Sequence, residues 1–86
     1  MASKNMASKN MAEDPYERLA NAIILNAVAD YRAALKKIKR NPKSKAAIDA
    51  VLQIEKFFRS SWYQQLTLVD GEFLIRKLQE EIRQSE

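Results

Sequence analysis

Residues 14–40 read DPYERLANAIILNAVADYRAALKKIKR, and this stretch indicates the fold class. Asp14 can accept a hydrogen bond from an unpaired amide of a first helical turn, Pro15 suits the first helical position, and Glu17 completes a capping-box-like pattern. Apolar residues then recur at alternating spacings of four and three, which is the period of an amphipathic helix. They are Ala20, Ile24, Ala27, Tyr31, Ala34 and Ile38. We therefore predict one long helix over residues 14–40.

Two further helices are predicted from the rest of the chain. Asn41-Pro42 ends the first helix and can cap the next, whose apolar stripe reaches Trp62. Thr67-Leu68-Val69-Asp70 is a second helix-start pattern. The two stripes consist of Ala47, Val51, Ile54 and Phe58, and then of Val69, Phe73, Leu74, Leu78 and Ile82.

These signals predict an all-α fold: a three-helix domain with a long first helix, a second helix, a short turn and a third helix. The helices are expected over residues 14–40, 42–60 and 67–83. Ser60-Ser61 either breaks the second helix or caps the turn over residues 62–66. No alternation with period two, which is typical of a strand, occurs in the sequence.

The N-terminal residues are expected to lie outside the folded domain. MASKN occupies residues 1–5 and again residues 6–10, so we interpret residues 1–12 as a disordered tail or one added by cloning, and residues 13–86 as a single helical domain. Such a domain is close to the size at which a single hydrophobic core is only just sufficient for a stable fold. Residues 19–29 are apolar on nearly all sides of a helix, which predicts a homo-oligomer. Its interface is expected to use Ile23, Ile24, Leu25 or Val28.

The composition excludes several kinds of chemistry. The chain has no cysteine and no histidine, so it lacks disulfides, thiolate metal sites and the commonest general base. Ser60 and Ser61 have no histidine partner, and no glycine-rich loop is present to cradle a phosphate. We expect a protein that is not an enzyme, with no cofactor, no metal and no membrane span. The expected location is a bacterial cytoplasm.

A basic run surrounds the predicted junction of the first two helices. Seven positive charges and no acid lie between Tyr31 and Ile48, which favours a polyanionic partner, either nucleic acid or a nucleotide-type ligand. A lysine-rich, solvated helix end is the alternative interpretation. Neutralising these side chains is expected to leave folding almost untouched. The seven are Arg32, Lys36, Lys37, Lys39, Arg40, Lys43 and Lys45.

Residues 57–63 read FFRSSWY and place four aromatic rings close together. One interpretation is a corner of the core, at the end of the second helix, in which Trp62 is buried. The other is an exposed contact surface formed by Arg59, Trp62 and Tyr63. Both interpretations stay open, because only some of these rings can face one core.

Three polar features have a structural and a functional interpretation each. Asp70-Gly71-Glu72 fits the start of a helix, where a glycine costs stability unless another backbone or a ligand approaches closely. Asn21 and Asn26 interrupt the apolar segment. They can set the register at an oligomer seam or contact a ligand.

Several blocks of the chain resemble a family of short proteins carried by phages, prophages and conjugative elements of Gram-positive bacteria. The resemblance spans residues 16–83 and is most specific at FFRS-x-W followed by LT-x-x-DGE. It implies a phage-like accessory product and carries over no catalytic or binding residue. Small helical products of this kind often regulate or block host components, including defence systems. The blocks are residues 21–24, 30–35, 57–60 with 62–63, and 66–67 with 70–72.

Two functions follow as hypotheses. In the first, the protein is a non-enzymatic accessory factor that holds an anionic partner with its basic run, in a regulatory or anti-defence role. In the second, it is a protein–protein interaction module that docks on a host protein through the aromatic corner and inhibits it.

Overall fold

The computed structural model describes residues 14–85, and this part of the chain is all-helical, with no strand. Four helices follow one another: α2 (Pro15–Arg40), α3 (Lys45–Phe58), α4 (Ser61–Leu66) and α5 (Gly71–Gln84). The predicted all-α class is confirmed, and the expected turn before the last long helix is the short helix α4. The prediction of a tail over residues 1–12 lies outside the described residues.

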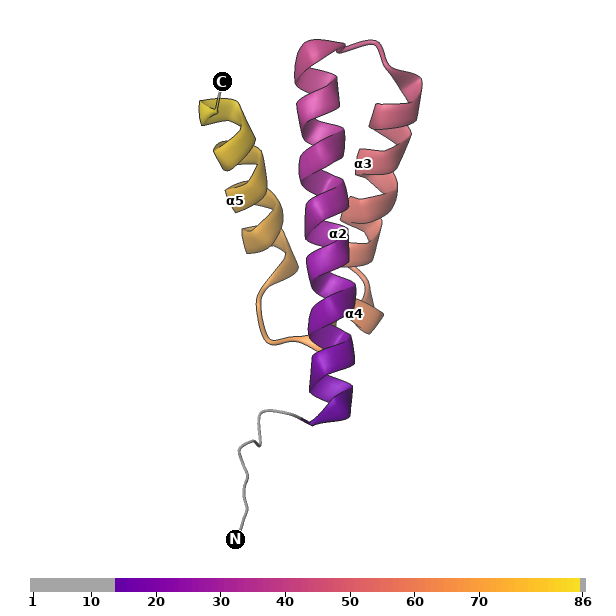
Figure 1. The fold of residues 1–86 in the computed structure, drawn as a ribbon, viewed down its shortest axis with the longest axis vertical. Coiled ribbons are helices and arrows are strands. Elements are labelled where there is room, and N and C mark those ends of the chain that lie inside the picture. Colours follow the sequence, from indigo (N-terminus) through magenta and orange to yellow (C-terminus); the bar gives the residue numbers. More distant parts are fainter. Residues whose placement is uncertain (1–13, 86) are drawn as a thin grey trace, which may run out of the picture.

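Helix α2 is the central element of the fold. The Asp14 carboxylate accepts a hydrogen bond from the Tyr16 amide at 3.0 Å, and Pro15 occupies the first helical position, as the sequence predicts. The helix has 26 residues and is therefore about 39 Å long. In the view of Figure 1 it lies between α3 and α5, which also contact each other, and its N-terminal end extends past both. Helix α3 runs antiparallel to α2, whereas α5 runs parallel to it.

The second helix begins later than predicted. It starts at Lys45 rather than at residue 42, because the Ser44 hydroxyl accepts a hydrogen bond from the Ala47 amide at 3.3 Å and caps the helix there. Asn41-Pro42 instead forms a turn, in which Oδ1 of Asn41 accepts a hydrogen bond from the Lys43 amide at 3.3 Å. The cap is thus supplied by the hydroxyl that directly precedes the helix.

The third long helix also begins later than predicted, at Gly71 rather than at residue 67. The Asp70 carboxylate accepts a hydrogen bond from the Phe73 amide at 2.9 Å and is the helix cap. Thr67 accepts a hydrogen bond only from the Val69 amide, at 3.2 Å, which forms a local turn. The Thr-x-x-Asp pattern therefore ends at the cap instead of beginning with it.

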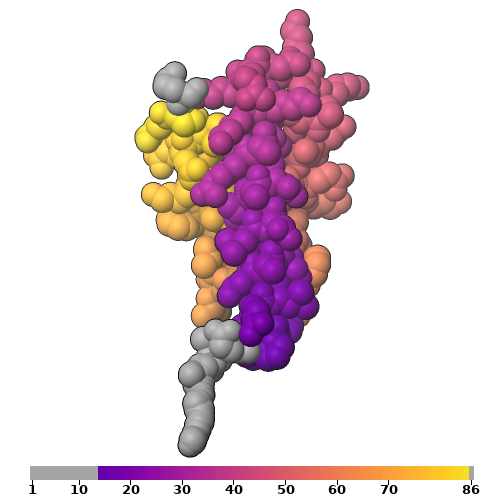
Figure 2. All heavy atoms as spheres, in the orientation of Figure 1, coloured from indigo at the N-terminus to yellow at the C-terminus, as the bar shows by residue number. Residues whose placement is uncertain are grey.

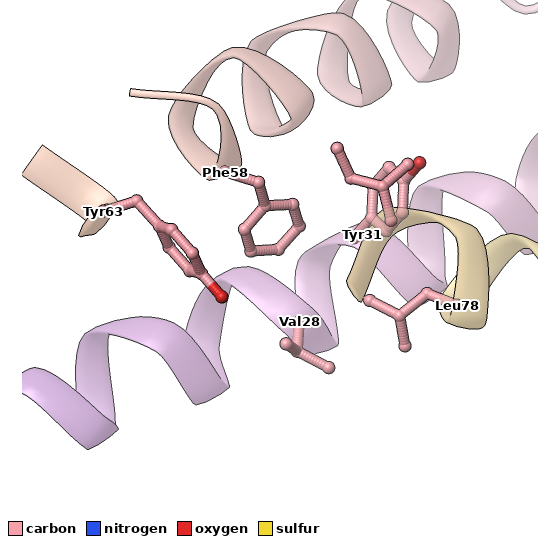
Figure 3. Close-up of a cluster of buried hydrophobic side chains, with 6 residues drawn as sticks. Val28, Tyr31, Phe58, Tyr63 and Leu78 are labelled. Atoms are coloured by element: carbon pink, nitrogen blue, oxygen red, sulfur yellow. The ribbon is translucent and has the colours of Figure 1, made fainter. Parts of the chain in front are cut away.

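One cluster of buried side chains joins all four helices, and Figure 3 shows part of it. The predicted stripes of the first two helices are confirmed by the burial of Tyr31 and Phe58. The stripe of the third helix is wrong at Val69 and Phe73, which are 49% and 48% exposed. The same stripe is confirmed at Leu78 and Ile82, which are buried, and the inward face also includes Ile75, which the predicted stripe does not contain.

Three aromatic rings form the centre of this cluster. Phe58 packs edge-to-face on Tyr31, with ring centroids 5.7 Å apart, and on Tyr63, with centroids 5.6 Å apart. All three side chains are at most 1% exposed. Figure 3 shows the ring of Phe58 between the two tyrosines. The centre of the core therefore combines rings from α2, α3 and α4.

The Tyr31 hydroxyl connects three helices through hydrogen bonds inside the domain. It donates to Oε2 of Glu55 on α3 at 2.6 Å and accepts from Nε2 of Gln79 on α5 at 3.1 Å. Gln79 also donates to the same Glu55 oxygen at 3.3 Å. Burial first, and then the hydrogen bond to Glu55, raise the pKa of Tyr31, so the hydroxyl stays protonated and can donate.

Gly71 lets the start of α5 approach the end of α3 closely. A Cβ atom at this position would collide with the backbone carbonyl oxygen of Phe58. Of the two interpretations of this glycine, the structure supports the approach of another backbone. The close contact brings the first turn of α5 against the last turn of α3.

Gly71→Ala is expected to destabilise the fold by about 2 kcal/mol or more, although alanine is the better helix former by about 1 kcal/mol. The reason is that the new methyl group forces α5 away from the Phe58 carbonyl. Urea unfolding measures the change. Gln84→Ala, on the exposed end of the same helix, is the control and is expected to leave stability unchanged within about 0.5 kcal/mol. Equal stability of both variants would contradict the close approach.

Candidate anion-binding site

Five of the seven predicted cations lie together at the end of the domain where α2 passes into α3. Each is exposed, and the segment that carries them projects at one end of the molecule in Figure 2. We call these five side chains the basic tip. They are Lys36, Lys37 and Arg40 in the last turns of α2, Lys43 in the connection, and Lys45 at the start of α3.

The other two cations, Arg32 and Lys39, form hydrogen bonds with α5. Arg32 donates two hydrogen bonds to the Glu81 carboxylate, at 2.8 and 3.1 Å. The ammonium group of Lys39 donates to the carbonyl oxygen of Ile82 at 2.8 Å and to that of Ser85, at the end of α5. The Ile82 carbonyl also accepts hydrogen bonds from the amide and the hydroxyl of Ser85, so Lys39 adds a charged donor from another element to an end that Ser85 already caps.

This arrangement corrects one prediction. Neutralising the whole basic run was expected to leave folding almost untouched, but Arg32 and Lys39 help to hold α5 against α2. The sequence could not separate them from the other five cations, because their partners are 43 to 49 residues further along the chain.

The cations of the basic tip form no ion pair with the acids among residues 14–85. None of its five side chains has an ion pair or hydrogen bond with another of residues 14–85, and no acid lies between Tyr31 and Ile48. The C-terminus of α2 and the N-terminus of α3 meet here, and their opposite partial charges offset each other. The cationic side chains therefore set the local potential, which is positive.

The aromatic corner is mainly part of the core. Tyr63 is 1% exposed, so this predicted contact residue is not available to a partner. The guanidinium of Arg59 binds Glu72 and lies 3.6 Å from Glu55, and the hydrogen bond to Glu72 is the main reason why its pKa is raised. Trp62, by contrast, is 56% exposed, so the interpretation in which it is buried is wrong and the one in which it is exposed remains.

Trp62 sits at the edge of the core. Its ring packs edge-to-face on that of Phe57, with centroids 5.5 Å apart. Of the three predicted contact residues, Trp62 alone offers a largely uncovered side chain with no charged partner among residues 14–85. The proposed contact surface is thereby reduced to this ring and its surroundings.

The apolar segment of α2 is only partly covered by the rest of the chain. Val28 belongs to the core cluster and Ile24 packs against it, whereas Leu19 and Leu25 are 59% and 66% exposed. Asn21 and Asn26 are both exposed. The predicted interface residues thus divide between the core of this chain and its surface.

Neither a metal cluster nor a membrane span is found in the part of the chain that the structure describes. Within residues 14–85, no three His, Cys, Asp or Glu side chains come close enough to hold a metal ion. None of the described helices is both long and apolar enough to cross a membrane. In comparisons with known proteins, no family model matches the chain, and no match is found among curated proteins or solved structures.

The different roles of two neighbouring lysines can be measured. Lys39→Met is expected to lower the free energy of unfolding by about 1 kcal/mol, because the carbonyls at the end of α5 lose their charged donor and the link to α2 that it forms. Lys36→Met, three residues earlier on the same helix, is expected to change it by less than about 0.5 kcal/mol. Urea unfolding of both variants checks this. A larger loss for Lys36→Met would contradict the assignment.

Proposed function

We propose that this protein is a non-enzymatic accessory factor that binds nucleic acid through the basic tip. The observation that carries the proposal is the set of five exposed cations on adjoining segments, without an acidic partner among residues 14–85. Such a surface attracts a chain of phosphates, because neutralising several of them releases their condensed counterions.

A nucleic acid fits the basic tip better than a single nucleotide does. Recognition of a base commonly uses stacking on an aromatic ring, and the aromatic residue nearest in sequence, Tyr31, is fully buried. Four of the five cations are lysines, which act as flexible point charges rather than as rigid bidentate donors. We therefore expect binding to the phosphate backbone with little dependence on base sequence.

A regulatory or anti-defence role in a phage or mobile element agrees with this surface. The resemblance to small proteins of phages and conjugative elements supports such an origin, and a factor of this kind meets nucleic acid in the host cytoplasm. The second hypothesis, inhibition of a host protein through the aromatic corner, has weaker support, because Tyr63 is buried and Arg59 is paired with Glu72.

A charge-matched pair of triple variants tests the proposal. Lys36→Gln, Arg40→Gln and Lys43→Gln remove three cations from the basic tip and spare Arg32 and Lys39. Fluorescence anisotropy with a labelled DNA duplex, between about 50 and 200 mM salt, is expected to show weaker binding. The slope of log K against log salt should flatten by about one unit for each lost phosphate contact.

The control removes the same number of charges elsewhere. Lys56→Gln, Arg76→Gln and Lys77→Gln also take away two lysines and one arginine, all exposed, from α3 and α5. This variant is expected to keep most of the affinity and the salt slope of the unchanged protein. Both triple variants should fold, as circular dichroism can show. Equal losses in the two variants, or no binding by the unchanged protein, would contradict the proposal.

A further inference from the structure

A continuous groove runs between α2 and α3, and α5 contributes no residue to it. One part, of about 520 Å³, has a floor of short side chains, and Lys37 of the basic tip also lines it. The second part, of about 300 Å³, is lined by the larger Ile23, Phe57 and Trp62. Both parts share Asp30, Gln53 and Ile54, which makes them one groove. The alanines of the floor are Ala33, Ala34, Ala46, Ala47 and Ala50.

The shape of the groove suits a pair of helices. Short side chains along the floor allow another helix backbone to approach to about 8 Å, the lower end of helix packing distances. At the other end, Trp62 is 56% exposed, and Leu19, one turn before Ile23 on the same side of α2, is 59% exposed. Two antiparallel helices with such an open face form half of a four-helix bundle.

Two polar groups of the groove, Asp30 and Gln53, complement each other as acceptor and donor. Asp30 on α2 and Gln53 on α3 both lie where the two parts of the groove join. Neither side chain has a hydrogen bond or ion pair with another of residues 14–85. The carboxylate only accepts hydrogen bonds, whereas the amide of Gln53 can donate. A twofold axis along the groove would place Asp30 of each copy opposite Gln53 of the other, so the dimer would contain this contact twice.

We propose that a second copy of this chain closes the groove, so that the two helix pairs form a four-helix bundle. Helix α2 of each copy then lies against α3 of the other and runs antiparallel to it. The alanines face alanines, and the Ile23–Trp62 end meets its own counterpart. Asn26, which lines the second part, lies at the same seam. A second copy is favoured over an unrelated helix because its Gln53 can donate to Asp30, and because its alanine floor and its Ile23–Trp62 end meet the same features of the first copy.

This arrangement has a consequence beyond stability. An axis along the groove keeps both basic tips at the same end of the dimer, where they form one larger cationic surface. The dimer does not rest on the proposed function, since the groove shares only Lys37 with the basic tip, and the triple variant of the tip leaves Lys37 in place. Loss of one property therefore leaves the other measurable.

Light scattering of the full chain, coupled to size-exclusion chromatography, tests the dimer. Ala33→Lys places a long charged side chain in the groove, and Ala29→Lys makes the same change on the exposed side of α2 outside it. The unchanged protein and Ala29→Lys are expected to be dimers at about 100 μM. Ala33→Lys should raise the dissociation constant by about tenfold or more, with unchanged helicity. A monomeric unchanged protein, or equal dissociation of both variants, would overturn the proposal.

The direction of the axis has its own test. The chain has no cysteine, so Lys43→Cys gives a single position for a spin label at the tip. Pulsed electron spin resonance of the dimer is expected to show labels within about 30 Å, because both tips lie at one end. A twofold axis across the groove would put them at opposite ends, about 40 Å or more apart at 1.5 Å per residue. The longer distance would overturn the proposed arrangement.

Discussion

The position of α5 depends on the buried hydroxyl of Tyr31. This one group donates to Glu55 on α3 and accepts from Gln79 on α5, so three helices meet at a single oxygen atom. Because a buried polar group that loses its partners costs free energy, other placements of α5 are disfavoured. The apolar contacts of Ile75, Leu78 and Ile82 supply the burial, and the hydrogen bonds select the register.

The two faces of the α2–α3 pair follow from this placement. Helix α5 covers one side, where Glu81 meets Arg32 and the last carbonyls meet Lys39. The other side stays open as the groove with its alanine floor. The five cations of the basic tip form no ion pair with another of residues 14–85. The same packing that completes the core thus separates structural cations from those that a partner can reach.

Local signals in the sequence predicted local structure well. Asp14 and Ser60 cap helices as their sequence context indicates, and the stripe through Tyr31 is buried. Predictions failed where the local structure depends on contacts with an element that is distant in the sequence. Two capping patterns competed before α5, and choosing Thr67 over Asp70 placed the start of the helix four residues too early, so that Val69 was assigned to its inner face. The division of the basic run, the open groove and the role of Gln79 depend on where α5 packs, which no local pattern contains.

Two buried tyrosines allow the most direct test of the link through Tyr31. The Tyr31 hydroxyl has two partners, whereas that of Tyr63 has none among residues 14–85. Urea unfolding of Tyr31→Phe is expected to show a loss of about 1–3 kcal/mol, because Glu55 and Gln79 lose their shared partner. Tyr63→Phe, which removes the same atom, should show no loss or a small gain. Equal losses, or a greater loss for Tyr63→Phe, would contradict the account.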